Sequence, residues 1–283
     1  MVHPVLVLHG GTGIKPDHKR LGPIRRNLRA VSAKVFDYLK DHNALESVSY
    51  AVRLLEDDPL FNAGTGSTLQ EDGRARMSAS IMNGAAVQFA GVVNIERVRN
   101  PVHIADALMD EDDRLLCGPG ATRFARAKGF RAWNTITALR RRQWLQRLKD
   151  SSTGHGTVGA IALDADGRLA AATSTGGKGF ERVGRVSDSG TPAGTYANGE
   201  AAVSCTGMGE DILDEALAVR LVQRVTDGMA IKRAFAVTFG EMKLRRRRVA
   251  AIGLDRHGQW TWETTIPLLV AVARTSARWI ESY

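Results

Sequence analysis

The sequence predicts an α+β domain in which helices cover the outer faces of β-sheets. Apolar residues recur at three- and four-residue steps from Ile24 to Leu39 and from Leu45 to Leu55, which is the pattern of amphipathic helices. Two similar stretches, 159–173 and 250–264, each contain an apolar strand, an LD-x-x-G turn and a second strand. Early helices followed by hairpins with further helices between them are typical of sheets with helical outer layers. Periodicity alone leaves a generic α+β domain open.

The remaining elements follow from local signals along the chain. Val5–Leu8 is a short apolar strand that runs into the glycine-rich segment 9–13. The second helix ends at "EDDPLFNAGTG" (56–66), because Pro59 and the glycines stop a helix. The other expected elements are a buried strand at 85–93, helices within 104–110 and 120–129, and two helices between the hairpins at 210–225 and 230–242.

The composition is typical of a soluble globular protein. Of the 283 residues, 43% are hydrophobic and 24% are charged, and no apolar run approaches the ~18 residues of a membrane span. The first residues lack the basic and long apolar regions of a signal peptide. Cys117 and Cys205 have neither CxxC nor CxxH spacing, which argues against a disulfide framework or a zinc site. We therefore expect a cytoplasmic protein with no membrane partner.

The net charge of +9 raises the question of an acidic partner such as nucleic acid. The basic excess lies in two clusters, 140–149 and 243–248, and the rest of the chain is nearly balanced. We expect both clusters to be solvated surface and expect no nucleic-acid partner.

Thr157 stands where an apolar strand begins, after Gly156 and after a polar, basic segment, 134–153, that we interpret as a linker. A threonine hydroxyl needs a base beside it to attack an amide. If the chain is cut before Thr157, the freed α-amine, with a reference pKa near 7.7–8.0, supplies that base. The alternative is a β-branched residue that merely suits a strand entrance. No G-x-S-x-G, HExxH or P-loop motif offers a competing site, so we predict that Thr157 is a nucleophile.

Six motifs in register make the chain similar to a known family. They are "LHGGTG" (8–13), "LFNAGTGS" (60–67), "HGTVGAIALD" (155–164), "ATSTGG" (172–177), "GRVSDS" (184–189) and "CTGMGE" (205–210). With these motifs the sequence resembles the plant-type asparaginase and isoaspartyl peptidase family of N-terminal-nucleophile hydrolases. The resemblance implies a four-layer αββα sandwich, made as a single-domain precursor over 1–283. Cleavage between Gly156 and Thr157 would give an α chain, 1–156, with its basic linker at about 134–156, and a β chain, 157–283. It also implies a homodimer of cleaved units.

The resemblance also assigns roles to residues of the site. Thr157 would act in both self-cleavage and substrate hydrolysis, and Thr175 would orient its hydroxyl; alternatively, Thr175 caps a turn at a strand end. Arg185 and Asp188 would clamp the α-carboxylate and α-ammonium of the substrate, which suits a planar guanidinium fork and a carboxylate acceptor. Without the neighbouring motifs this pair could be a surface ion pair. The remaining assignments are Thr206 and Gly207 as the oxyanion hole, Gly209 for close backbone approach, and Asn62, Gly10 and Gly11 beside the nucleophile.

No cofactor is implied for catalysis, but the family's 55–65 loop wraps a structural sodium ion with main-chain carbonyls. Here these would come from Leu55, Glu56, Asp58, Phe61, Ala63 and Thr65. The chain departs from its relatives at Ser78 and Asn83, where Asp is common, and at Met208, where a second Thr is frequent. The basic segment 243–248 also replaces a glycine-rich approach to the late hairpin, near the substrate pocket.

The implied reaction is hydrolysis of L-asparagine, of β-aspartyl dipeptides, or of both, through a threonine β-aspartyl ester. These departures leave the preference among such small substrates open. One alternative is a related hydrolase for another amide such as glycosylasparagine, although Gly156 fits the asparaginase side, because glycosylasparaginases usually carry an acidic residue there. The other is an uncleaved, non-catalytic protein whose basic clusters bind an acidic partner.

Overall fold

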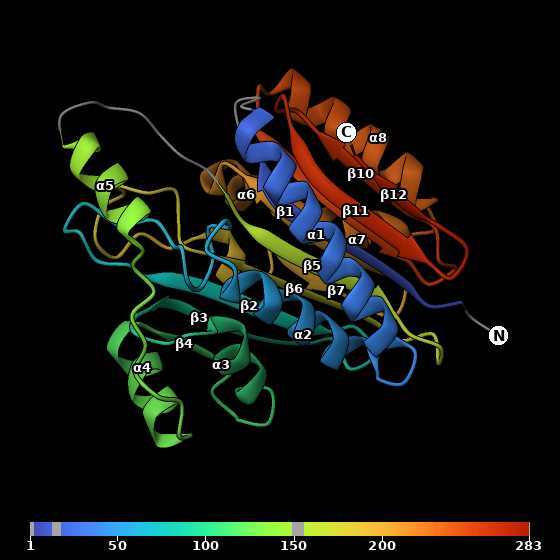
Figure 1. The fold of residues 1–283 in the computed structure, drawn as a ribbon. Coiled ribbons are helices and arrows are strands. Elements are labelled where there is room, and N and C mark those ends of the chain that lie inside the picture. The colour runs from blue at the N-terminus through green and yellow to red at the C-terminus, as the bar shows by residue number, and fades with distance from the viewer. Residues whose placement is uncertain (1–2, 13–17, 149–155, 283) are drawn as a thin grey trace.

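The protein consists of two stacked β-sheets between two layers of helices (Figure 1). The computed structural model describes residues 3–12, 18–148 and 156–282. One apolar cluster fills the space between the large sheet and its helices, a second lies between the sheets, and a third lies under the helices of the small sheet. These three cores separate four layers, which confirms the predicted αββα sandwich.

The large sheet has eight strands and the small sheet has four. The order in the large sheet is β12 (Trp279–Glu281), β11 (Leu269–Thr275), β1 (Val5–Thr12), β5 (Val158–Leu163), β6 (Leu169–Thr175), β2 (Met77–Asn83), β3 (Gln88–Ile95) and β4 (Leu115–Cys117). Only the β3–β4 pair is parallel. The order in the small sheet is β10 (Trp260–Thr264), β9 (Val249–Asp255), β8 (Ala201–Gly207) and β7 (Thr195–Ala197).

Helices cover the outer face of each sheet. Those on the large sheet are α1 (His18–Leu39), α2 (Ala44–Asp57), α3 (Pro101–Ala107) and α4 (Gly118–Ala127). Those on the small sheet are α6 (Gly209–Glu215), α7 (Leu217–Thr226) and α8 (Ile231–Leu244). A short 3₁₀ helix, η1 (Asp188–Gly190), precedes β7. None of the helices in the described ranges has both the length and the hydropathy that a membrane span requires.

Local sequence explains most of these boundaries. At the start of α2, Asn43 accepts from the backbone N–H of Glu46, whose side chain accepts from the N–H of Asn43, a reciprocal cap. Both predicted hairpins form, as β5–β6 and β9–β10. Cys117 and Cys205 are both free thiols, as expected.

The structure corrects two expected elements. The strand expected at 85–93 begins only at Gln88, because 84–87 form the turn of the β2–β3 hairpin and Val87 has φ 50°. The single helix expected at 210–225 is broken at Ala216, whose left-handed backbone (φ 45°) separates α6 from α7.

The segment interpreted as a linker contains a helix. Residues Ala138–Arg147 form α5, and the Thr137 side chain caps it by accepting from Arg140 N. α5 stands apart from the four layers (Figure 1). Residues 149–155, the rest of the expected linker before Gly156, lie outside the described residues.

The sheet topology brings distant segments to one edge. β1 and β6 flank β5 and run antiparallel to it, so His9 pairs with Gly159 and Ser174 with Val158. The end of β1, the start of β5 and the end of β6 therefore meet. β8 packs against β5 and β6 from the other sheet.

Candidate active site

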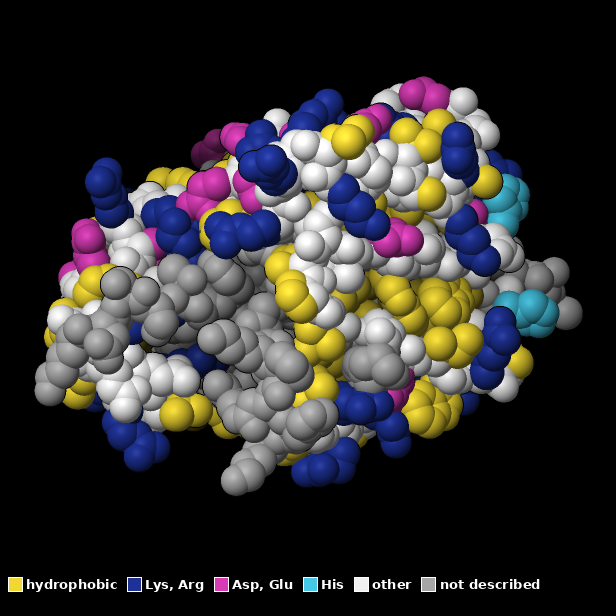
Figure 2. Space-filling view, turned by 90° about the horizontal axis from the view of Figure 1, so that it is seen from above, with side chains coloured by type: hydrophobic (Ala, Val, Ile, Leu, Met, Phe, Trp, Pro, Cys, Tyr) yellow, Lys and Arg dark blue, Asp and Glu magenta, His cyan; other side chains and the backbone are white. Residues whose placement is uncertain are grey.

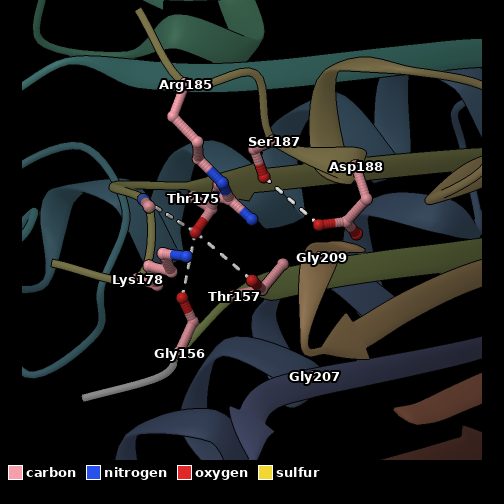
Figure 3. A pocket seen from close by; sticks show the side chains of 10 residues that line it. Gly156, Thr157, Thr175, Lys178, Arg185, Ser187, Asp188, Gly207 and Gly209 are labelled. Carbon is pink, nitrogen blue, oxygen red and sulfur yellow. Dashed lines mark hydrogen bonds between the residues drawn. The ribbon is translucent and has the colours of Figure 1, made fainter. Parts of the chain in front are cut away.

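Thr157 lies at this meeting point, in the wall of a pocket (Figure 3). Its side chain is buried, with 7% of the residue exposed. The pocket wall also contains Thr175, Lys178, Arg185, Asp188 and Gly207. Residues from the end of β6, the 176–188 segment and the end of β8 thus converge on one hydroxyl that directly precedes β5.

The Thr157 hydroxyl belongs to a short chain of hydrogen bonds. Thr157 Oγ1 donates to Thr175 Oγ1 over 3.3 Å, and Thr175 Oγ1 donates to the Gly156 carbonyl over 3.0 Å (Figure 3). Thr175 Oγ1 also accepts from Gly177 N at 3.1 Å. With one donor and two lone pairs, the Thr175 hydroxyl is fully used, and its orientation is therefore fixed.

The Gly156 carbonyl has a second donor in Asn62. Asn62 Nδ2 lies 2.8 Å from Gly156 O and 2.6 Å from Gly177 O, and Asn62 Oδ1 accepts from Thr68 N at 2.8 Å. Two fixed donors thus point at the oxygen of the peptide bond next to the Thr157 hydroxyl. Such an arrangement stabilises negative charge that develops on a carbonyl oxygen under attack.

Gly10 and Gly11 lie at the end of β1, where only Gly11 is next to Thr157. Gly11 has φ 101°, and a Cβ there would lie 3.1 Å from both N and O of Thr157. Gly11 therefore lets the end of β1 approach Thr157. A Cβ at Gly10 would instead meet the Phe61 ring at 2.8 Å, so glycine there makes room for Phe61.

His9, in the same motif, is a site neighbour that the sequence analysis did not single out. Its Nε2 lies 2.9 Å from Ser204 Oγ, which is 2.7 Å from Thr173 Oγ1. Burial lowers the pKa of His9 to about 3, and a hydrogen bond to the backbone of Thr157 offsets little of this, so the imidazole is neutral at pH 7. A Cβ at Gly159 would overlap both Ser204 Oγ and His9 Nε2, so Gly159 makes room for this buried pair.

Arg185 and Asp188 lie on the same pocket wall, but Arg185 forms its ion pair with Glu210. Arg185 Nε and Nη2 each lie 3.1 Å from a Glu210 carboxylate oxygen, and Lys178 Nζ lies 3.2 Å from Glu210 Oε1. Burial would raise the pKa of Glu210, but the hydrogen bonds and charge of Arg185 outweigh that effect and lower it to about 2. Glu210 and Lys178 were not predicted from the sequence, although Glu210 closes the "CTGMGE" motif.

Asp188 is buried at the far side of the pocket from Lys178 (Figure 3). Its Oδ1 accepts from Ser187 Oγ at 3.2 Å, and its Oδ2 has no hydrogen-bond partner among the described residues. Burial raises the pKa of Asp188 to about 6, against the opposing charge of Arg185. An unpartnered, buried carboxylate oxygen at a pocket wall is suited to accept from a ligand cation.

Thr206, Gly207 and Gly209 lie where β8 ends and α6 begins. Thr206 Oγ1 is buried and, within the described ranges, has no hydrogen-bond partner. Gly207 has φ 135°, and a Cβ there would lie 2.6 Å from Arg248 O. A Cβ at Gly209 would lie 2.3 Å from Arg185 Nη2 and 2.7 Å from Asp188 Oδ1. Gly209 therefore lets the guanidinium and the carboxylate approach each other.

The six residues expected around sodium lie at the end of α2 and in the loop that follows it. Glu56 O accepts from Thr65 N at 2.7 Å, Asp58 O from Phe61 N at 3.1 Å, and Phe61 O from Arg140 Nη2 at 3.4 Å. The described residues contain no cluster of three or more His, Cys, Asp or Glu side chains suited to a metal. Any cation here would depend on neutral main-chain oxygens.

The Glu56 side chain points into the protein rather than to a cation. Its Oε1 accepts from Ser174 Oγ at 2.6 Å and from Val102 N at 3.0 Å. Burial raises the pKa of Glu56 to about 8 despite these bonds. The carboxyl group therefore joins α2, α3 and the end of β6 in its neutral form at pH 7.

The basic cluster at 243–248 does not line the pocket. Arg245 and Arg247 form ion pairs with Glu215, at 2.7 and 3.1 Å, and Arg247 also pairs with Asp211 and Asp214. These arginines tie the β9 entrance to α6. On the face shown in Figure 2, Lys and Arg side chains are scattered among acidic and neutral ones.

Comparison with known proteins gives a consistent result over nearly the whole chain. The family model described as Asparaginase matches residues 2–281. An isoaspartyl peptidase/L-asparaginase of Nostoc sp. is 45% identical over 95% of this chain and 91% of its own length. The isoaspartyl peptidase/L-asparaginase of Bos taurus is 36% identical over 93% of this chain and 91% of its own. A plant-type L-asparaginase of Pyrococcus furiosus is 40% identical, covering 75% of this chain and 76% of its own.

Proposed function

The chain belongs to the asparaginase family, and on that premise we propose that it hydrolyses L-asparagine, β-aspartyl dipeptides or both, with Thr157 as the nucleophile. The observation that carries this proposal is the Thr157 hydroxyl beside a carbonyl to which Asn62 and Thr175 both donate. The same hydroxyl faces the Arg185 and Asp188 wall of the pocket. One nucleophile is thus placed for a first reaction on its own chain and a second on a small substrate.

In the first reaction, Thr157 Oγ1 attacks the carbonyl carbon of Gly156. Asn62 Nδ2 and Thr175 Oγ1 stabilise the oxyanion that forms on Gly156 O. The C–N bond then breaks, the hydroxyl proton moves to the α-nitrogen of Thr157, and an ester links Gly156 to Oγ1. Water hydrolyses this ester and leaves chains 1–156 and 157–283, the second beginning with a free α-amine.

In the second reaction, that α-amine takes the Oγ1 proton as the hydroxyl attacks the side-chain carbonyl of the substrate. Thr206 Oγ1, which has no other partner in the described structure, and the Gly207 N–H stabilise the oxyanion. The C–N bond of the substrate breaks, and ammonia, or the second amino acid of a β-aspartyl dipeptide, leaves with the proton from the α-amine. Water then hydrolyses the β-aspartyl ester and releases aspartate.

Substrate recognition depends on complementary charges. Asp188 accepts from the α-ammonium, and Arg185 donates to the α-carboxylate. Glu210 takes two of the five guanidinium donors of Arg185, so three remain for the substrate. Glu210 also fixes the plane of the guanidinium, which favours bidentate binding of a carboxylate.

Three further features complete the proposal. Main-chain carbonyls of the 55–65 loop, from Leu55, Glu56, Asp58, Phe61, Ala63 and Thr65, would hold a structural sodium ion, since neutral oxygens can replace the hydration shell of a monovalent cation. The cleaved units form a homodimer, as the family resemblance implies. Two free thiols, Cys117 and Cys205, suit a reducing compartment such as the cytoplasm.

The test combines intact mass spectrometry with a hydrolysis panel. Wild-type protein should give two chains, and Thr157→Ala should give one folded 283-residue chain, because only the attacking hydroxyl is lost. The cleaved protein should hydrolyse L-asparagine or a β-aspartyl dipeptide faster than glycosylasparagine. A single wild-type chain without activity would support a non-catalytic binding protein, and a preference for glycosylasparagine would support the other amide hydrolase.

A further inference from the structure

The segment before the cleavage site lies over the loop that contributes Asn62. Residues 133–147, including α5, contact the 61–73 loop, which follows α2 and leads to β2. In Figure 1 this segment stands at one end of the molecule, beside the loop and outside both sheets. The basic cluster 140–149 begins within this helix, and its first arginine is half-buried against the loop.

Arg140 makes the most direct contacts with the loop. Its Nε donates to Gly66 O over 2.5 Å, and its Nη2 lies 3.4 Å from Phe61 O. The N–H of Gly66 in turn donates to Thr135 O over 3.0 Å. Two backbone groups of Gly66 and the carbonyl next to Asn62 are therefore all bonded to the 135–140 segment.

Two tryptophans secure the same loop on either side. Trp144 Nε1 donates to Gln70 O over 2.9 Å, and its ring lies 3.1 Å from where a Cβ at Gly73 would be. Trp133 Nε1 donates to Thr65 Oγ1 over 3.3 Å. Contacts with Thr65, Gly66 and Gln70 thus extend along the loop.

The same loop positions the Asn62 side chain that bonds to the proposed scissile peptide. Phe61 O, bonded to Arg140, is the carbonyl that directly precedes Asn62 N. The Asn62 side chain is aligned within the loop by Thr68 N, and Asn62 Nδ2 then donates to Gly156 O over 2.8 Å. A displacement of about 1 Å at such a donor can cost on the order of a hundredfold in rate.

We propose that Arg140 is a positioning residue for self-cleavage: it holds the 61–70 loop so that Asn62 donates to the Gly156 carbonyl. This rests on the proposed function, since it concerns the first of its two reactions. It replaces the expectation that the 140–149 cluster is only solvated surface. The segment that precedes the cleavage site therefore contributes to its own cutting.

Arg141 and Arg142 supply matched controls. Both are exposed, both stand in the same helix, and neither side chain has a hydrogen bond or ion pair in the described structure. Replacing any of the three arginines by Gln removes one positive charge and alters helix propensity equally. Only the replacement at 140 removes the contacts with Gly66 and Phe61.

The experiment follows cleavage of newly made protein. Chains are synthesised in a cell-free system, synthesis is stopped, and conversion of the 283-residue chain into two chains is timed on gels. Arg140→Gln should slow conversion by at least about tenfold, whereas Arg141→Gln and Arg142→Gln should convert at the wild-type rate. Arg140→Lys, which keeps the charge and one donor nitrogen, should be converted at a rate between that of Arg140→Gln and that of wild type.

A second measurement separates positioning from general support of the fold. Thr206 and Gly207, not Asn62, are proposed to act on the substrate oxyanion, so fully cleaved Arg140→Gln should keep kcat within about twofold of wild type. Cleavage of Arg140→Gln at the wild-type rate, or an equal loss in cleavage and kcat, would overturn the inference. If Arg140→Gln does not fold, Arg140→Lys is measured in its place, because it keeps the charge and loses the guanidinium that bonds to Gly66 O and Phe61 O. Slower cleavage then supports the inference and unchanged cleavage refutes it. Failure of wild type to cleave would refute the proposed function instead.

Discussion

Replacing Thr175 by Val would remove the hydroxyl that links the Thr157 hydroxyl, the proposed nucleophile, to the Gly156 carbonyl. Valine keeps the shape of the side chain but cannot accept from Thr157 Oγ1 or donate to Gly156 O, at 3.3 and 3.0 Å. It also leaves Gly177 N without its acceptor. Thr175 is 2% exposed, so no water replaces these bonds without rearrangement.

The expected loss can be estimated from these bonds. Loss of one oxyanion donor typically costs about 2.7–4 kcal/mol, or roughly 10²–10³ in rate. Asn62 Nδ2 remains as the second donor, so cleavage should slow by that factor rather than stop. Loss of the hydrogen bond from the half-buried Gly177 N–H should separately lower the free energy of unfolding by about 0.5–1.5 kcal/mol.

The assay is the time course of conversion into two chains, measured together with thermal unfolding. Thr173→Val is the matched control, because Thr173 is a fully buried residue of the same strand. Its hydroxyl contacts Ser204 Oγ at 2.7 Å rather than Gly156 or Thr157. The Thr173→Val variant should lose a similar amount of unfolding free energy and still be cleaved before Thr157. Conversion of Thr175→Val as fast as Thr173→Val would refute the assigned role of Thr175.

Three further outcomes follow from the same structure. Arg185→Lys keeps the charge but loses the planar fork, so KM for L-asparagine should rise about tenfold or more while cleavage before Thr157 is little changed; unaltered kinetics would remove Arg185 from substrate binding. Burial raises the pKa of Asp188 to about 6, so kcat/KM should fall as the pH drops through about 6, where the protonated carboxyl no longer accepts from the α-ammonium; a profile without this inflection would contradict that role. Burial also raises the pKa of Glu56 from 4.5 to about 8, so its stabilising effect is full below the unfolded pKa and is lost as the pH rises through about 8. The unfolding temperature of wild type should therefore decrease from about pH 5 to pH 9 more steeply than that of Glu56→Gln, and parallel curves would show that Glu56 does not titrate as described.

Much of the layer architecture could be read from local patterns. The apolar spacing of 24–39 and 45–55 and the two LD-x-x-G hairpins depend on neighbours within a few residues, and each forms as expected. The position of Thr157, directly after Gly156 and before a strand, is likewise recognisable from its neighbours in the sequence. Where a single backbone conformation decides the outcome, as at Ala216 or Val87, the pattern extended an element too far.

Only the tertiary structure decided which side chains that are far apart in the sequence contact each other. Glu210 is the ion-pair partner of Arg185, and Arg140 binds the loop around Asn62 from more than 70 residues away. The spacing of charged residues in the sequence does not indicate which partners they will contact. Those partners depend on sheet register and on which loops end at the same edge of a sheet.

The sequence by itself thus determined the helices, the hairpins and a threonine placed to become a nucleophile, since these depend on short-range spacing. Only the folded chain decided which donors reach the Gly156 carbonyl, which carboxylate holds Arg185, and that the basic segment forms a helix bonded to the 61–73 loop. The physical reason is that hydrogen bonds act over about 3 Å, and such distances between remote residues exist only once both sheets have assembled.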